Sequence, residues 1–280
     1  MSKEVIVLAV HGMGDTSEDF ADGLREALAD RLGAAAWDSV HFDAIYYQRV
    51  LQANQERVMR AMRTQDLDGI RLRKFLLYGF SDAAGLERRA ASPGSPYEQV
   101  QSIIRATLKS AYEFVGGPRP VVVIAQSLGC QVISNYLWDA QKPGKASQGV
   151  WKSPTTRRGS KLDGFLRLKS LKYLYTTGCN IPIFLAGFPE DQIRAVTATE
   201  RGYAFRWKNY YDEDDVLGWP LKPLSASYRQ AIYRDYPVNA NGSLLGTFTH
   251  GWNALSHTRY WTDADVIKPL ARDIRGLLPS

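Results

Sequence analysis

Two short, uninterrupted runs of apolar residues constrain the fold of this 280-residue chain more than any other feature. They are Val5 to Val10 and Val121 to Ala125. A strand that is apolar on both faces is typical of a parallel sheet that helices cover on both sides. Both runs are far shorter than the roughly 18 residues that a membrane-spanning helix needs. We therefore expect buried strands in an α/β domain and no transmembrane segment.

Helical and strand-like patterns alternate along the rest of the chain. Ser95, Pro96 and Glu98 have the spacing of a helix start, and residues 48–80 are rich in helix formers. A last helix is expected from Thr262 to about Leu278. Further strands are expected at 40–47, 171–176, 183–186, 205–211 and 232–238, the last forming a hairpin with 244–249. Such alternation predicts a mostly parallel central sheet with helices on both faces, in one domain spanning residues 1–280.

The composition is that of an ordinary globular protein, with 45% hydrophobic and 23% charged residues. The only two cysteines, Cys130 and Cys179, form neither a disulfide framework nor a metal-binding cluster, and we interpret both as small buried hydrophobes. The run that ends at Val10 meets His11-Gly12, which is not a signal-peptide cleavage site. We expect a cytoplasmic protein without a metal or another cofactor.

The net charge of +6 is concentrated in one segment. Residues 142–172 hold nine basic side chains and one acidic side chain, Asp163, whereas the rest of the chain is slightly acidic. Residues 141–165 lack periodicity, so they are interpreted as an excursion of the domain, either a solvated loop or a lid. A basic lid would make weak contact with anionic surfaces. Nucleic-acid binding through this segment is an alternative, but we do not expect it.

The residues after the second apolar run predict a reactive serine. The sequence Val121-Val122-Val123-Ile124-Ala125-Gln126-Ser127-Leu128-Gly129 reads as a strand, a tight turn and the start of a helix. A serine at the tip of such a turn has a strained backbone, which lifts its hydroxyl clear of the sheet. The turn also requires small residues two positions before and after the serine, and Ala125 and Gly129 meet that requirement. A serine that merely caps the helix is the alternative.

This pattern resembles the nucleophile elbow of the α/β-hydrolase family, in particular of bacterial lipase-like and esterase-like serine hydrolases. Ala125 replaces the first glycine of the family pattern, and Gln126 stands where many lipases have histidine. The resemblance implies an oxyanion hole formed by backbone N–H groups of Leu128 and Met13, because His11-Gly12-Met13 looks like the second donor turn of the family.

The resemblance also implies an acid and a histidine, in that order, after Ser127. Of the four histidines, only His250 and His257 follow it. His257 precedes the expected last helix, where the family places its base, and His250 is the alternative. The acid is expected in the turn 212–215, where Asp215 matches the family position and Asp214 and Asp212 compete with it.

The combined expectation is a serine hydrolase of the α/β-hydrolase fold that cleaves a carboxylic ester through an acyl-serine intermediate. Its partner would be a small-molecule or lipid ester. Two alternatives remain: an acyltransferase with the same residues, or a non-catalytic binding protein on the same fold.

Overall fold

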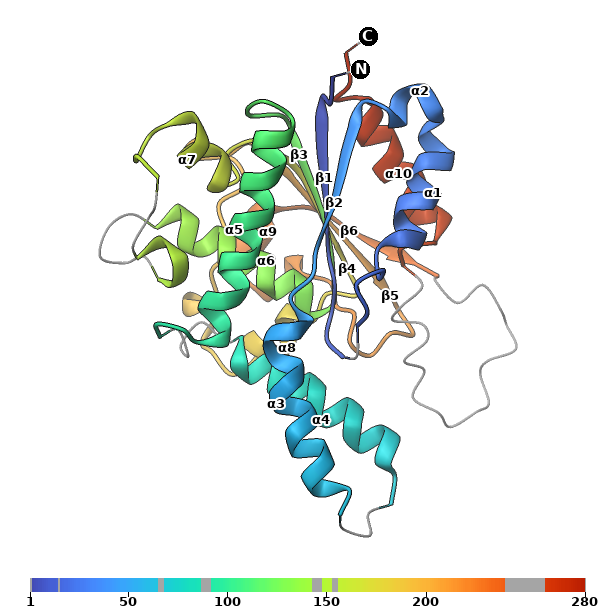
Figure 1. Cartoon of the computed structure of the whole chain (residues 1–280), viewed down its shortest axis with the longest axis vertical. Helices are drawn as coiled ribbons and strands as arrows, with labels where there is room; N and C mark the ends of the chain where they lie inside the picture. Colours follow the sequence, from blue (N-terminus) through green and yellow to red (C-terminus); the bar gives the residue numbers. More distant parts are fainter. Residues whose placement is uncertain are drawn as a thin grey trace.

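Six parallel strands form the sheet at the centre of the structure, which is a computed structural model (Figure 1). The structure describes residues 2–14, 16–64, 68–86, 92–142, 148–152, 156–239 and 260–279. Their spatial order is β2-β1-β3-β4-β5-β6, and each pair of neighbours is parallel. The strands are β1 (Val5–Val10), β2 (Val40–Ile45), β3 (Val121–Gln126), β4 (Leu171–Thr177), β5 (Arg206–Asp212) and β6 (Ile232–Val238). The expectation of an α/β protein with a mostly parallel sheet is therefore confirmed.

Helices cover both faces of this sheet (Figure 1). The α-helices are α1 (Asp22–Leu32), α2 (Ala34–Trp37), α3 (Gln48–Met62), α4 (Ile70–Gly85), α5 (Pro96–Phe114), α6 (Leu128–Gln141), α7 (Lys161–Leu166), α8 (Ile181–Leu185), α9 (Ala226–Ala231) and α10 (Ala264–Arg275). On one face, Val5, Val7 and Ala9 of β1 join a core with α1 and α10. On the other face, the alternate residues of β1 join a core with α5 and α6. Because both faces of β1 are buried, its sequence is uninterruptedly apolar.

Local signals predicted some elements correctly and others not. Ser95 caps α5, because its Oγ accepts a hydrogen bond of 3.3 Å from the N–H of Glu98. Of residues 183–186, expected as a strand, the first three instead belong to helix α8 and Ala186 is its C-cap. The first turn of this helix contains Pro182. The last helix begins at Ala264 rather than at Thr262, because the side chain of Asp263 caps it. The expected hairpin has one described half, β6, which pairs in parallel with β5, whereas residues 244–249 lie outside the described residues.

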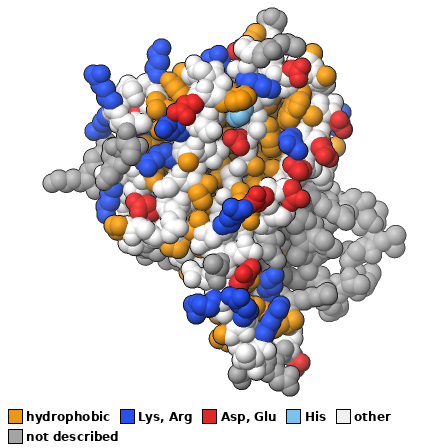
Figure 2. Space-filling view, in the orientation of Figure 1, with side chains coloured by type: hydrophobic (Ala, Val, Ile, Leu, Met, Phe, Trp, Pro, Cys, Tyr) orange, Lys and Arg blue, Asp and Glu red, His pale blue; other side chains and the backbone are white. Residues whose placement is uncertain are grey.

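Two segments extend the basic α/β pattern. Helices α3 and α4 pack on each other and project beyond the end of the sheet, and Figure 2 shows Lys and Arg side chains gathered on this projection. In the basic excursion, Val150, Trp151 and Phe165 are buried. Trp151 packs against Tyr136 with 5.4 Å between ring centroids. The described parts of 141–165 are thus folded onto the domain; its role as a lid stays a prediction.

Within the described residues, no helix combines the length and the apolar character that crossing a membrane requires. Cys130 and Cys179 are free thiols with no exposed surface, as expected for small buried hydrophobes.

Candidate active site

The candidate site lies at the carboxyl edge of the sheet, where the strand order changes direction. From β1 the chain places β2 on one side and β3 on the other. At such a switch point the loops after the two central strands run in opposite directions, which leaves a crevice between them. Ligands of open α/β sheets bind in this crevice. Gly12 follows β1 and Ser127 follows β3, so the motifs that the sequence singled out flank the switch point.

Ser127 has the strained backbone that the sequence predicted. Its φ is 52° and its ψ is −124°, a conformation that is costly for a residue with a side chain. The turn is held on the strand side, where the N–H of Ser127 donates to the carbonyl of Thr177 at 3.0 Å, and on the helix side, where Cys130 N–H donates to the Ser127 carbonyl at 3.0 Å. Strain that is held on both sides is typical of functional turns.

The hydroxyl of Ser127 is buried without a partner. The residue is 1% exposed, and its Oγ makes no hydrogen bond within the described part of the chain. The side chain also does not cap α6, so the alternative of a capping serine does not fit. A buried polar atom normally has a hydrogen-bond partner, and an exception calls for an explanation such as catalysis.

Two glycines bring β1 and its turn against this serine. A Cβ on Gly12 would lie 2.7 Å from the Cβ of Ser127. A Cβ on Gly129 would lie 2.3 Å from the carbonyl oxygen of His11 and 2.7 Å from that of Val10. The glycine two residues after the serine therefore lets the first turn of α6 approach the end of β1.

The two expected oxyanion donors are available. Neither the Met13 N–H nor the Leu128 N–H donates a hydrogen bond to any described residue. Leu128 is the first residue of α6, whose N-terminus carries a partial positive charge. Unpaired N–H groups at a helix N-terminus favour the binding of an anion, and an oxyanion that develops during acyl transfer is one.

His11 is a structural residue. The N–H of Tyr47 donates to its Nε2 at 3.0 Å, so its Nδ1 carries the proton and donates to the Gly12 carbonyl at 2.8 Å. Its ring stacks on the Tyr47 ring with 3.9 Å between centroids. Burial lowers the pKa of His11 from 6.5 to about 4, against a smaller opposing effect of the Gly12 hydrogen bond. A neutral imidazole with both nitrogens bonded is not a base for Ser127.

His41 is also remote from the candidate site. It pairs with Ile6 in the sheet, four residues before Val10 and Ile45 end the two strands. Its Nε2 lies 3.6 Å from a carboxylate oxygen of Asp43. The structure therefore agrees with the exclusion of both early histidines.

The three candidate acids differ in environment. Asp215 is 5% exposed; its Oδ2 accepts a hydrogen bond of 2.8 Å from the Tyr260 hydroxyl and its Oδ1 accepts one of 3.0 Å from Leu217 N–H. Asp212, at the end of β5, is buried and accepts from Asp214 N–H at 2.9 Å. Asp214 is exposed. A triad acid is buried and oriented by hydrogen bonds, which favours Asp215 over Asp214.

The two histidines expected as bases, His250 and His257, lie outside the described residues. The described chain resumes at Tyr260 and Trp261, which contact the carboxyl edge. The indole N–H of Trp261 donates to Oγ1 of Thr177 at 3.2 Å. Thr177 is the residue whose carbonyl receives the N–H of Ser127. Trp261, which follows both histidines in the sequence, is thus bonded to the residue that accepts the backbone N–H of Ser127.

Two further polar side chains at this edge have no partner. Gln48, beyond the end of β2, and Asn180, beyond the end of β4, each have 0% exposure. Both polar atoms of each amide lack a hydrogen-bond partner within the described ranges. Gln48, Ser127 and Asn180 thus follow β2, β3 and β4, three strands near the switch point. Sequence reasoning missed both residues, although a polar residue just after a strand is the signal that would have drawn attention to them.

A groove lies along helix α6. It has a volume of about 530 Å³ and is lined by residues of α6, such as Trp138, and by Ile181, Phe184 and Phe188 in and after α8. Gln131 also lines it, one turn of α6 after Ser127. This mostly apolar lining suits a hydrocarbon group.

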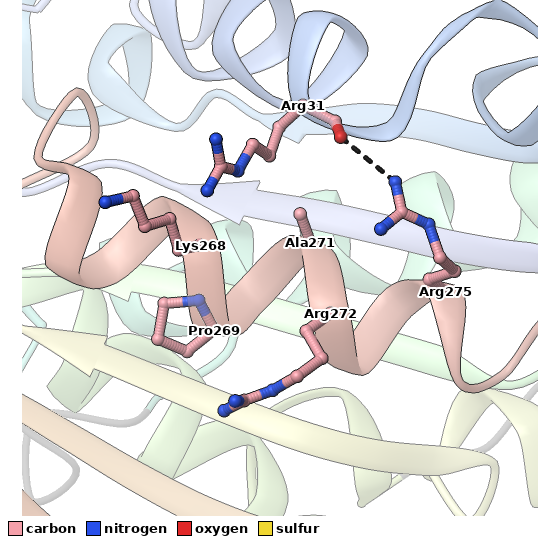
Figure 3. A pocket seen from close by; sticks show the side chains of 6 residues that line it. All are labelled: Arg31, Lys268, Pro269, Ala271, Arg272 and Arg275. Atoms are coloured by element: carbon pink, nitrogen blue, oxygen red, sulfur yellow. Dashed lines mark hydrogen bonds between the residues drawn. The ribbon is translucent and has the colours of Figure 1, made fainter.

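A second hollow, of about 330 Å³, lies between α1 and α10 and is lined by basic side chains (Figure 3). Arg275 donates hydrogen bonds to the carbonyls of Arg31 and Leu32 at 3.1 and 3.2 Å, so it satisfies the last turn of α1. We attribute the hollow to this contact between α10 and α1, in which Arg275 caps the C-terminal turn of α1.

No model of a known protein family matches this chain, and no curated protein matches it. Within the described residues, no group of His, Cys, Asp and Glu side chains has the arrangement of a metal site.

Proposed function

We propose that this chain is a serine hydrolase of the α/β-hydrolase fold, with Ser127 as nucleophile, that cleaves carboxylic esters. The observation that carries the proposal is the conformation of Ser127: a strained φ of 52° combined with a buried Oγ that has no partner in the described structure. A structural serine gains nothing from either property, whereas a nucleophile needs an unencumbered hydroxyl beside oxyanion donors.

In the proposed reaction, Ser127 Oγ bonds to the ester carbonyl carbon while its proton passes to a ring nitrogen of His257. The N–H groups of Met13 and Leu128 receive the negative charge that develops on the carbonyl oxygen. The ester C–O bond then breaks, and the leaving alcohol takes the proton from the imidazolium. Water, deprotonated by the same histidine, attacks the acyl-serine, releasing the carboxylic acid and restoring Ser127.

The choice of His257 is supported by the residues that follow it. Trp261 is bonded to Thr177 beside Ser127, and His257 precedes it by four residues. His257 is therefore the nearer of the two late histidines in sequence to this anchored residue, since His250 precedes Trp261 by eleven residues. Asp215, bonded to Tyr260, is the proposed acid.

The substrate we propose is a small-molecule or lipid ester whose hydrocarbon part lies in the groove along α6. Phe184 and Phe188 would contact an acyl or alkyl chain there. A cytoplasmic location and weak contact of residues 142–172 with anionic surfaces remain predictions.

Hydrolysis of p-nitrophenyl esters with acyl chains from acetyl to lauroyl tests the proposal. We expect turnover by the wild type, none above background for Ser127→Ala, and full turnover for Ser110→Ala, a matched change at an exposed position of α5. His257→Ala should abolish turnover and His250→Ala should retain it. Equal rates for the wild type and Ser127→Ala would contradict the proposal. Faster product release on adding an alcohol, with a new ester formed, would favour the acyltransferase alternative.

A further inference from the structure

A carboxylate from the projecting helix α4 reaches the turn that follows β1. Asp82 is 0% exposed, and its Oδ2 accepts a hydrogen bond of 3.3 Å from the N–H of Gly14, a residue 68 positions earlier in the chain. Gly14 is the neighbour of Met13, the proposed oxyanion donor. A buried carboxylate is costly unless it is well bonded, so this contact requires support from other groups.

Gln55 of α3 supplies that support. Its Nε2 donates to Oδ1 of Asp82 and also to the Ser81 hydroxyl, at 2.8 Å. Gln55 is itself 4% exposed. The carboxylate is thus held between two helices, with one oxygen directed to Gln55 and the other to the turn.

The same helix also fixes the side chain of Met13. A Cβ on Gly79 would lie 2.7 Å from the Sδ of Met13, so this glycine leaves the space that the methionine occupies. Gly79 precedes Asp82 by three residues and therefore lies on the same side of α4. Helix α4 consequently holds the turn at two points: the side chain of residue 13 and the N–H of residue 14.

We infer that Asp82 is a positioning residue for the oxyanion hole: it holds the turn so that the N–H of Met13 points at the oxyanion. Gly12, pressed against Ser127, fixes the turn on one side of Met13, and the Asp82–Gly14 bond fixes it on the other. This inference rests on the proposed function. It implies that the α3–α4 projection affects the rate of ester cleavage, because Gln55 and Asp82 connect this projection to the turn.

Loss of the tether should slow chemistry more than binding. An oxyanion donor acts only if it is aimed in advance, and removal of one donor costs about 10²–10³ in rate. Asp82→Leu leaves the Met13 N–H present but less well fixed. We therefore expect kcat for p-nitrophenyl butyrate to fall about 10- to 100-fold. KM should stay within about threefold, because the lost interaction acts in the transition state.

A conservative variant separates positioning from packing. Asp82→Asn keeps an oxygen for Gly14 N–H, and its amide can donate to Oε1 of Gln55, which has no partner among the described residues. We expect it to restore kcat to within about threefold of the wild type. Ser81→Ala is the matched control, since the Ser81 hydroxyl is bonded to Gln55 and to the Tyr78 carbonyl, and to no described residue of the turn. It should leave kcat unchanged.

Hydrogen exchange of the Gly14 amide, measured by NMR, reports the tether without any substrate. It should be at least about tenfold faster in Asp82→Leu than in the wild type and unchanged in Ser81→Ala. If Asp82→Leu does not fold, Gln55→Met, which removes the support of the carboxylate, should show a smaller change in the same direction.

The outcomes distinguish this inference from the proposed function. Unchanged Gly14 exchange in the folded variant, or wild-type kcat in Asp82→Leu, or an Asp82→Asn as slow as Asp82→Leu, would overturn the inference and leave the hydrolase intact. A wild type that cleaves no ester would overturn the proposed function and the positioning role with it, even if the exchange result held.

Discussion

The hydroxyl of Tyr260 donates a hydrogen bond of 2.8 Å to Oδ2 of Asp215, across 45 residues of sequence. The same hydroxyl accepts a hydrogen bond of 2.8 Å from the N–H of Asp212 at the end of β5. The chain that follows both late histidines is thereby fixed to the acidic turn.

The acid is identified by comparing two neighbouring aspartates. Asp215→Asn should lower kcat for ester hydrolysis by up to about 10⁴, because an amide no longer selects the required histidine tautomer. Asp214→Asn, an equal change at an exposed position, should leave kcat unchanged. Steady-state kinetics of both variants measure this, and a large loss in Asp214→Asn alone would assign the acid to Asp214.

Tyr260→Phe removes the hydroxyl that joins the two aspartates. The Asp212 N–H then lacks its acceptor, and we expect the free energy of unfolding to fall by about 1–3 kcal/mol. Urea denaturation measures this change. Tyr233→Phe is the control, because Tyr233 is 53% exposed and its stability should change by less than about 0.5 kcal/mol. Equal stabilities of the wild type and Tyr260→Phe would show that the hydroxyl does not anchor the chain.

Gly12→Ala tests the close approach of the first turn to the nucleophile. The added methyl would lie 2.7 Å from the Cβ of Ser127, so the turn must move away. We expect ester turnover to fall at least about tenfold, as the oxyanion donor moves with the turn. Gly164→Ala in α7, where the added carbon would have only an ordinary contact of 3.8 Å with Cδ of Lys169 among the described residues, should be neutral. Turnover by Gly12→Ala at the wild-type rate would rule out this packing.

Two buried groups near this turn predict opposite effects of pH on stability. The folded state holds the pKa of His11 at about 4, so between about pH 4 and 6.5 only the unfolded chain takes up this proton, and stability falls as pH decreases. Burial raises the pKa of Asp82 from 3.8 to about 6, against the smaller effects of its hydrogen bonds to Gln55 and Gly14. Between about pH 4 and 6 the folded state therefore keeps a proton that the unfolded chain loses, and stability falls as pH increases.

Asp82→Asn removes the second effect and leaves the first. Relative to the wild type, its free energy of unfolding should therefore increase between pH 4 and 6, by about 3 kcal/mol at most. Urea denaturation at several pH values measures the difference. Asp30→Asn, at an exposed position of α1, should follow the wild-type curve. If the free energy of unfolding of Asp82→Asn and of the wild type changed in parallel between pH 4 and 6, this would contradict the protonation of Asp82 in that pH range.

The elements that local patterns determine were predictable. The apolar runs of β1 and β3, the start of α5 at Ser95 and the turn at Ser127 each follow from a few adjacent residues. Helix α8 was not, because Ile183 to Ala186 is too short for periodicity to separate a strand from a helix. The start of α10 was displaced because Asp263, rather than Thr262, provides the cap.

The contacts that complete the candidate site could not be predicted from the sequence. The Asp82–Gly14 bond joins residues 68 positions apart, and the Trp261–Thr177 bond joins residues 84 positions apart. Nothing in the local sequence of α4 distinguishes Asp82 from a solvated surface acid; only its burial between α3 and the β1 turn does. The structure likewise separates Asp214 from Asp215 by exposure, which a run of four acidic residues does not show.

Reaction with a fluorophosphonate probe, followed by intact-mass measurement and peptide mapping, tests the central claim most directly. We predict one adduct per wild-type chain, on Ser127, with the displaced fluoride as the second product, and no adduct on Ser127→Ala. Unmodified wild-type protein after prolonged exposure, or an adduct that persists in Ser127→Ala, would contradict the assignment of Ser127 as the nucleophile.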